Sequence, residues 1–245
     1  MSGIRARRLK LTYPRMETPA VNIEDLTVEP GEFMAIMGES GSGKTSLLRL
    51  IAGLESPDQG DIYIGGVWMN ETPVGRRPVQ MIFQSLALWP HLRVMDERGY
   101  SNLSFPLKVR RWTREQIVDR VRGVSNRVGL KEELYDRKPN ELSGGERQRV
   151  ALARAMVTES KVFLMDEPLS SLDPISRPKM RTEIRRLHDE LRATTVYVTH
   201  SAGDARDMAD RIAVIKDGRL LTVGTYEQLT APTADQYVRM LVSSY

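Results

Sequence analysis

Cysteine is absent from the 245 residues of this chain. Its absence excludes disulfides and thiolate metal sites, and it is typical of proteins that reside in a reducing compartment. The chain also lacks a run of about 18 apolar residues, so no helix is expected to span a membrane. No apolar segment follows the basic residues near the N-terminus, as a secretion signal would require. We therefore expect a cytoplasmic protein, a location that still allows docking on a membrane-embedded partner.

Low-complexity tracts and internal repeats do not occur either. Hydrophobic residues make up 40% and charged residues 28% of the chain, which are ordinary values for a folded globular protein. The net charge is +4, with short basic clusters at residues 5–8 and 108–111. Such clusters are compatible with nucleic acid, with anionic lipid headgroups or with a solvated surface. Because the basic residues are otherwise spread out, nucleic acid is not expected as a partner.

The stretch GESGSGKT, residues 38–45, fits the phosphate-binding loop pattern G-x-x-x-x-G-K-S/T at every required position. An apolar run at Phe33–Met37 is typical of a buried strand, and Ser46–Ala52 has helical character. The glycines let the backbone turn tightly and aim its N–H groups inward, and the following helix presents the positive end of its dipole to the same point, where a phosphate chain can sit. Lys44 would reach the β- and γ-phosphates of a nucleoside triphosphate, and the Thr45 hydroxyl would bind Mg²⁺. The full set of expected nucleotide contacts in this loop is Gly38, Ser40, Gly41, Ser42, Gly43, Lys44, Thr45 and Ser46.

Strand and helix patterns alternate along most of the chain. Short strands are expected between Ile4 and Met69, and a helical stretch is expected later, in which Thr113 and Gln116 form a capping box. A second helix of that stretch should begin near Gly145 or Glu146. The other expected elements are strands at Val79–Phe83, Lys161–Met165, Thr195–Thr199 and Ile212–Lys216, helices at Ser176–Arg192 and Ala202–Ala209, and a hairpin through Asp217-Gly218 into Arg219–Val223. This alternation predicts an α/β fold with a largely parallel sheet and helices on both faces.

Two acidic residues, Asp166 and Glu167, end the apolar strand that begins at Lys161. Ligands of open α/β sheets lie at the carboxyl ends of the strands, so both carboxylates are expected near the phosphate-binding loop. Asp166 would hold Mg²⁺ directly or through water, and Glu167 would polarise an attacking water. The alternative is a strand that simply ends in a surface acidic pair, which the phosphate-binding loop in the same chain disfavours.

A second glycine-rich string, LSGGERQ at Leu142–Gln148, opens the later helix. Ser143, Gly144, Gly145 and Glu146 would gather backbone N–H groups and the positive end of a helix dipole at one point. The chain therefore has two helix starts that suit a phosphate, although one ATP has a single γ-phosphate.

The LSGGE string, placed between the phosphate-binding loop and the acidic strand end, resembles the ATPase subunit of an ABC transporter over nearly the whole chain. The resemblance implies a single domain over 1–245 with a P-loop NTPase, RecA-like fold. Its catalytic α/β core, with an antiparallel β subdomain, would span 1–87 and 158–245. A helical signature subdomain would be inserted over 88–157. In this family two subunits sandwich two ATPs head to tail, so the signature helix would serve the nucleotide of a partner.

Further residues match motifs of this family in the expected order. Tyr13 lies where the family has an aromatic residue that stacks on adenine, although packing also accounts for a single tyrosine. Gln84 resembles the glutamine that approaches Mg²⁺ and water and links the site to the membrane subunit. Residues 171–173 resemble the loop that contacts the opposite subunit, and His200 resembles the switch histidine at the γ-phosphate. The implied catalytic residues are Lys44, Gln84, Glu167 and His200, and the implied metal ligands are Thr45, Gln84 and Asp166.

Residues 84–92 and 102–108 resemble importer ATPases that work with a solute-binding protein. The resemblance implies ATP and Mg²⁺ as cofactors, a second ATPase subunit, and permease subunits in the cell membrane on whose inner face the chain would lie. The solute-binding protein would act indirectly. Residues near Met95–Tyr100 are an insertion relative to that family, Ser171 and Ser201 are departures, and regulation through a C-terminal domain is not expected. The alternatives are an exporter ATPase and a non-transport ATPase acting on nucleic acid or ribosomes. The sequence specifies neither the solute nor whether the dimer has two identical chains.

Overall fold

The structure is a computed structural model that describes residues 2–243. The chain divides into two compact units. Unit 1 comprises residues 2–81, 161–167 and 188–243, and unit 2 comprises residues 82–160 and 168–187. The helical insert expected over 88–157 falls within unit 2, which also includes residues 82–87, 158–160 and 168–187.

The main sheet of unit 1 has six strands in the order β10-β9-β3-β8-β7-β6. Strand β3 pairs in parallel with β8 and β9, and strand β7 pairs in parallel with β8. Strand β10 forms an antiparallel hairpin with β9. The strand bounds are β3 (Phe33–Met37), β6 (Val79–Ile82), β7 (Val162–Asp166), β8 (Thr194–Val198), β9 (Arg211–Lys216) and β10 (Arg219–Gly224). The prediction of a largely parallel α/β sheet is confirmed.

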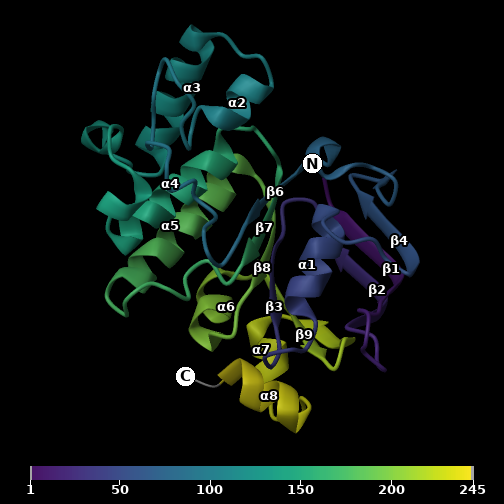
Figure 1. Cartoon of the computed structure of the whole chain (residues 1–245). Helices are drawn as coiled ribbons and strands as arrows, with labels where there is room; N and C mark the ends of the chain where they lie inside the picture. The colour runs from purple at the N-terminus through teal and green to yellow at the C-terminus, as the bar shows by residue number, and fades with distance from the viewer. Residues whose placement is uncertain (1, 244–245) are drawn as a thin grey trace. The chain divides into compact units, whose positions relative to one another are not determined.

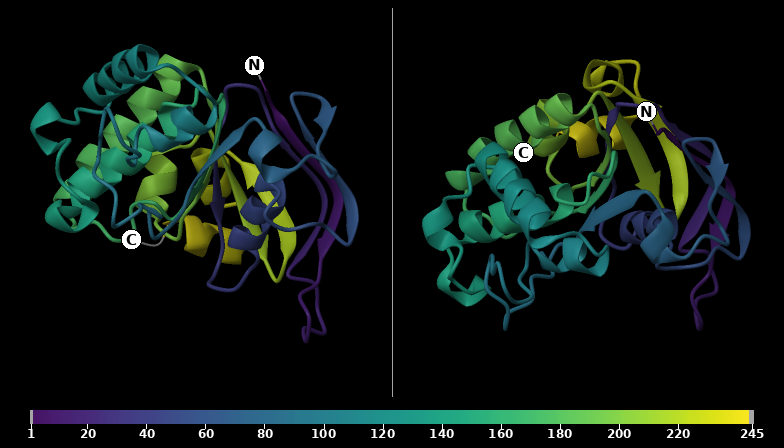
Figure 2. Two further views of the ribbon diagram at one scale, coloured as in Figure 1. Left: turned by 45° about the horizontal axis from the view of Figure 1, so that its top comes forward. Right: turned by 90° about the horizontal axis from the view of Figure 1, so that it is seen from above.

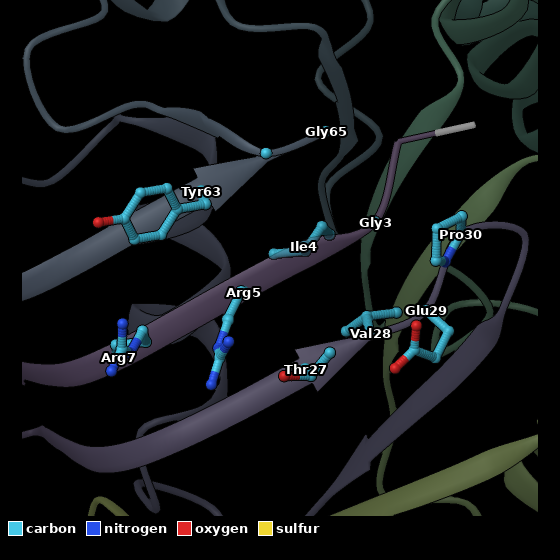
Figure 3. A pocket seen from close by; sticks show the side chains of 11 residues that line it. Gly3, Ile4, Arg5, Arg7, Thr27, Val28, Glu29, Pro30, Tyr63 and Gly65 are labelled. Carbon is cyan, nitrogen blue, oxygen red and sulfur yellow. The ribbon is translucent and has the colours of Figure 1, made fainter.

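A second sheet in unit 1 is antiparallel, with the order β2-β1-β4-β5. Its strands are β1 (Ile4–Leu11), β2 (Val21–Val28), β4 (Gln59–Ile64) and β5 (Val67–Trp68). Apolar side chains alternate with polar ones along β1, because successive side chains of a strand point to opposite faces. On the polar face Arg5 lies opposite Thr27 and Tyr63 in the strand register, and these residues line the shallow groove shown in Figure 3.

Alternate side chains of β3 pack into two different cores, one on each face of the main sheet. Met34 and Ile36 join the core formed with helix α1 (Lys44–Ala52) and the antiparallel sheet. Ala35 and Met37 join the core on the other face. That second core includes residues of α6 (Ala202–Met208), α7 (Tyr226–Thr230) and α8 (Gln236–Ser243). Helices therefore cover both faces of the sheet, as Figure 1 and the two views of Figure 2 show.

Unit 2 is mainly helical. Its helices are α2 (Phe105–Val109), α3 (Arg114–Arg127), α4 (Gly144–Met156) and the first part of α5 (Ser176–Leu191), which continues into unit 1. The capping box predicted at the start of α3 is confirmed, because the Thr113 side chain accepts a hydrogen bond from the Gln116 amide and the Gln116 side chain accepts one from the Thr113 amide. No helix within residues 2–243 combines the length and the apolar character needed to cross a bilayer.

Candidate functional site

The phosphate-binding loop connects β3 to α1, as the sequence predicts. Lys44 is a buried residue, with 6% of its surface exposed. It donates hydrogen bonds to the carbonyl oxygens of Gly38 at 2.9 Å and Glu39 at 2.6 Å. Burial lowers the pKa of Lys44, although Glu167 and Asp166 oppose that shift. A sheltered cation of this kind, folded back on its own loop, attracts an anion strongly because little water screens its charge.

Glycine is required in this loop for steric reasons. Gly43 has a φ of 100°, and a Cβ there would collide with the carbonyl oxygen of Ala20. A Cβ on Gly38 would collide with the carbonyl oxygen of Ile215. The loop backbone is held from outside as well, because the Gly218 amide in the β9–β10 turn donates to the Ser42 carbonyl at 3.0 Å.

The Ser42 hydroxyl in the same loop is buried and has no hydrogen-bond partner in the structure. Buried polar groups are normally satisfied, so an unpartnered hydroxyl needs an explanation. A phosphate oxygen seated in the loop would supply the missing partner, and the residues present therefore fit such a group.

The start of α1 and the end of β7 meet at a pair of oxygen ligands. The Thr45 Oγ1 donates a hydrogen bond to Oδ1 of Asp166 at 3.0 Å. Burial raises the pKa of Asp166, and the nearby Glu167 charge adds to that rise, while the bond from Thr45 opposes it. Hydroxyl and carboxylate oxygens suit Mg²⁺, which typically takes few protein ligands and completes its shell with phosphates and water. Within the residues that the structure describes, no group of three or more His, Cys, Asp or Glu side chains could hold a metal ion.

Glu167 and His200 form the second pair of the site. Nδ1 of His200 lies 3.2 Å from Oε2 of Glu167. Neighbouring parallel strands deliver the two residues, since the Glu167 amide donates to the Val198 carbonyl of β8 at 3.0 Å. Glu167 has a φ of 43°, a left-handed conformation that is uncommon for a residue with a Cβ and often marks a functional position. The glutamate side chain is 22% exposed and the histidine side chain 60%, so the pair is open to a ligand from solvent.

Tyr13 lies close to the start of α1. Its hydroxyl donates a hydrogen bond to Oγ of Ser46 at 3.2 Å, and its ring packs against the core below. This contact ties the end of β1 to the helix that follows the phosphate-binding loop. Stacking of Tyr13 on adenine stays a prediction.

The signature string lies in unit 2 and forms the first turn of α4. A capping box closes this turn, because the Ser143 side chain accepts from the Glu146 amide at 3.3 Å and Glu146 Oε2 accepts from the Ser143 amide at 2.7 Å. The bond from the Ser143 amide lowers the pKa of Glu146. A Cβ on Gly145 would meet nothing within 4 Å, so the turn presents bare backbone that a ligand can approach.

Gln84 is exposed in unit 2, just after β6 ends. The structure thus brings together the predicted residues of unit 1, namely the phosphate-binding loop, Asp166, Glu167, His200 and Tyr13. Participation of Gln84 and of Ser143–Glu146 in the same reaction centre stays a prediction. One residue of unit 2 was not anticipated: Arg154, which binds the segment after Gln84. The sequence signal was a single charge inside the apolar run VALARAM.

The family of the chain follows from comparison with known proteins. Residues 21–170 match the model of a family described as ABC transporter. The chain belongs to the ABC transporter family. Two relatives are import ATP-binding proteins: the trehalose/maltose protein MalK of Thermococcus litoralis is 47% identical over 93% of this chain, and the oligosaccharides protein MsmX of Bacillus subtilis is 45% identical over 92%. This chain spans only 61% and 60%, respectively, of the length of those ABC proteins.

Solved structures of ATP-binding cassettes have the same fold. A dimeric structure of the cassette MJ0796 is 31% identical and matches with a TM-score of 0.79, covering 91% of this chain and 98% of that one. A second dimeric MJ0796 structure, in a post-hydrolysis state with ADP and phosphate, is 30% identical and matches with a TM-score of 0.77 over the same fractions. The expected P-loop NTPase fold is therefore confirmed.

Proposed function

We propose that this chain is an ATP-hydrolysing subunit that powers solute import through an ABC transporter. The observation that carries the proposal is the hydrogen bond between Thr45 and Asp166, which joins the phosphate-binding loop to the acidic strand end. Glu167 and His200 lie at the same edge of the sheet. A loop for phosphates, oxygen ligands for a metal and a carboxylate for a water are the parts that phosphoryl transfer needs.

ATP would bind with its phosphates in the loop between β3 and α1. Backbone N–H groups, the buried Lys44 ammonium and the unpartnered Ser42 hydroxyl would hold the β- and γ-phosphates. Tyr13 would contact the adenine, a role that rests on the family resemblance.

Thr45 and Asp166 would hold Mg²⁺, with Gln84 assigned beside them on the family resemblance alone. When bound, the metal ion neutralises charge on the β- and γ-phosphates. Thr45 and Asp166 already lie within hydrogen-bond distance of each other, so little reorganisation of these two side chains is required.

Glu167 would orient and polarise the attacking water. Its carboxylate is restrained by the contact with His200, and its backbone has the uncommon left-handed φ of 43°. In phosphoryl transfer there is little covalent chemistry for the protein to do, so positioning of this kind supplies much of the rate enhancement. His200 would in addition approach the γ-phosphate.

A second ATPase subunit would complete each reaction centre. The open first turn of α4, at Ser143–Gly145, would contact the nucleotide bound by the partner. Dimeric structures of related cassettes support this arrangement. Closure over ATP would bring two chains together, and hydrolysis would weaken that contact.

Import is favoured over export because the relatives are import ATP-binding proteins. We accordingly propose permease subunits as partners, with this chain on the inner face of the membrane and a solute-binding protein acting indirectly. Selectivity for the solute would reside in those other chains.

Replacement of Glu167 by Gln tests the assignment. We expect Glu167→Gln to lower the ATP turnover number by at least about 10²-fold, because general-base catalysis contributes that much, while ATP binding and ATP-dependent dimers persist. The measurements are phosphate release and light scattering. Glu24→Gln, a change at an exposed carboxylate on β2, is the control and should keep the parental rate. Parental turnover in Glu167→Gln would contradict the role of Glu167.

A further inference from the structure

Arg154 connects α4 to the segment that follows Gln84. Its Nη1 donates to the Ala87 carbonyl at 2.6 Å and its Nη2 donates to the Leu86 carbonyl at 2.7 Å. The guanidinium also lies 5.0 Å from the centroid of the Trp89 ring. One side chain therefore contacts three residues of a single segment, Gln84–Trp89.

This segment has an unfavourable backbone at the point where Arg154 binds it. Leu86 and Ala87 have φ values of 59° and 46°, two consecutive left-handed residues that both carry a Cβ. Such residues persist only where surrounding contacts hold them. No helix or strand covers residues 83–104, so the regular backbone ladders that would otherwise fix Leu86 and Ala87 are missing there.

Trp89, which Arg154 contacts, is itself restrained by hydrogen bonds and an aromatic contact. Its amide donates to Oδ1 of Asn102 at 2.9 Å and its carbonyl accepts from Nδ2 of Asn102 at 3.1 Å. Its ring lies 4.7 Å from the ring of Phe105. The Arg154 contacts therefore reach a connected polar and aromatic cluster rather than an isolated loop.

The chemistry of arginine suits this contact. The guanidinium presents its N–H groups in a rigid planar fork, so it can bind two carbonyls at once and stack on an aromatic ring. Partial burial beside these carbonyls lowers the pKa of Arg154 to about 10. A lysine at this position has the charge but not the fork.

We propose that Arg154 is a positioning residue that makes the Gln84–Trp89 segment and α4 move as one piece. The inference rests on the proposed function in one respect: α4 begins with Ser143-Gly144-Gly145, the turn assigned to the partner's nucleotide. Arg154 lies about 15 Å along the helix axis from Gly144, at 1.5 Å per residue. A shift of the Gln84–Trp89 segment, for example on docking of a permease, would thus be transmitted along the rigid helix α4 to its first turn at Ser143–Gly145.

Arg120, on α3, provides a matched control because it also binds α4. Its guanidinium also donates two hydrogen bonds to carbonyls, those of Met156 at 2.8 Å and Val157 at 3.1 Å, at the C-terminal end of α4. Arg120 also forms an ion pair with Glu159 at 3.3 Å, so these contacts of Arg120 lie outside the Gln84–Trp89 segment. Replacement of either arginine by Met removes one partly buried guanidinium that binds two carbonyls, but only Arg154→Met releases residues 84–89.

Hydrogen exchange followed by mass spectrometry tests the anchor in the whole chain. Arg154→Met should raise exchange in peptides covering residues 84–92 by about tenfold, because a charged hydrogen-bond donor is lost, and Arg120→Met should leave those peptides unchanged. Arg154→Lys should give an intermediate rise and serves as the folded variant if Arg154→Met does not fold. Equal protection of residues 84–92 in the parent and in Arg154→Met, or in Arg154→Lys if Arg154→Met does not fold, would overturn the inference, as would an equal rise in exchange in Arg120→Met.

Steady-state kinetics test the consequence for the reaction. Arg154→Met, or Arg154→Lys in its place, should lower kcat while the KM for ATP changes by less than about twofold, because the phosphate-binding loop is not altered. Arg120→Met should keep the parental kcat. Parental kcat in the Arg154 variants would overturn the coupling role. An inactive parent chain would refute the proposed function instead, and the exchange experiment would still decide whether Arg154 is an anchor.

Discussion

The bond between Thr45 and Asp166 offers the most direct perturbation of the site. Thr45→Val removes the hydroxyl and keeps a β-branched side chain of similar shape. Asp166 is only 7% exposed, so its Oδ1 would lose the donor that now lies 3.0 Å away without free access to water. Hydrogen bonds to charged groups contribute about 1.5–3 kcal/mol, and we therefore expect the free energy of unfolding to fall by about 2 kcal/mol. For a chain of this size the melting temperature should drop by about 4–8 °C.

Thermal unfolding with and without ATP and Mg²⁺ separates stability from ligand binding. In the parent, Mg²⁺ should add to the stabilisation given by ATP, because ligands that bind only the folded state raise its stability. In Thr45→Val that additional effect should be lost. The hydrogen bond from Thr45 lowers the pKa of Asp166, so its loss in Thr45→Val should raise that pKa.

Thr45→Ser is the matched control, since it retains the hydroxyl and loses only a methyl group. It should respond to Mg²⁺ as the parent does. If Thr45→Val keeps both the parental melting temperature and the Mg²⁺ response, the bond contributes nothing measurable and Thr45 is not a metal ligand.

Two further predictions concern the phosphate-binding loop. Gly43→Ala should abolish ATP binding measured by calorimetry, because Gly43 has a φ of 100° and a Cβ there would collide with the carbonyl oxygen of Ala20. Gly75→Ala is the control and should bind ATP normally, because a Cβ there meets nothing within 4 Å. Parental affinity for ATP in Gly43→Ala would contradict the steric argument. Burial holds the pKa of Lys44 below its ordinary value of 10.5, so in the alkaline range just below 10.5 the unfolded chain binds more protons and the free energy of unfolding should rise with pH. In denaturant titrations, Lys44→Met should flatten this rise of the free energy of unfolding with pH. An unchanged pH dependence in Lys44→Met would refute the role of Lys44 in this rise.

The local parts of the site could be predicted because short sequence patterns determine them. The run at Phe33–Met37, the glycines after it and the helix that follows are adjacent in the chain, so no distant contact was needed to recognise β3, the loop and α1. The capping box at Thr113 was likewise read from a four-residue pattern. Helix α4 begins one or two residues before the expected start at Gly145 or Glu146, because Ser143 and Glu146 form a second capping box.

Features that depend on distant partners were not predictable in the same way. The contact between Glu167 and His200 requires the register of β7 against β8, which no pattern in either strand specifies. Helices α7 and α8 were missed because they are short and their apolar positions are defined by packing on β3 and β9. The role of Arg154 depends on carbonyls more than sixty residues earlier in the chain.

The rate of ATP hydrolysis per chain, measured as a function of chain concentration, tests the central claim most directly. If a single copy carries only part of each reaction centre, the rate per chain should fall towards zero as dilution separates dimers, and light scattering on the same samples should show that separation. A rate per chain that stays constant where scattering detects only monomers would contradict the account.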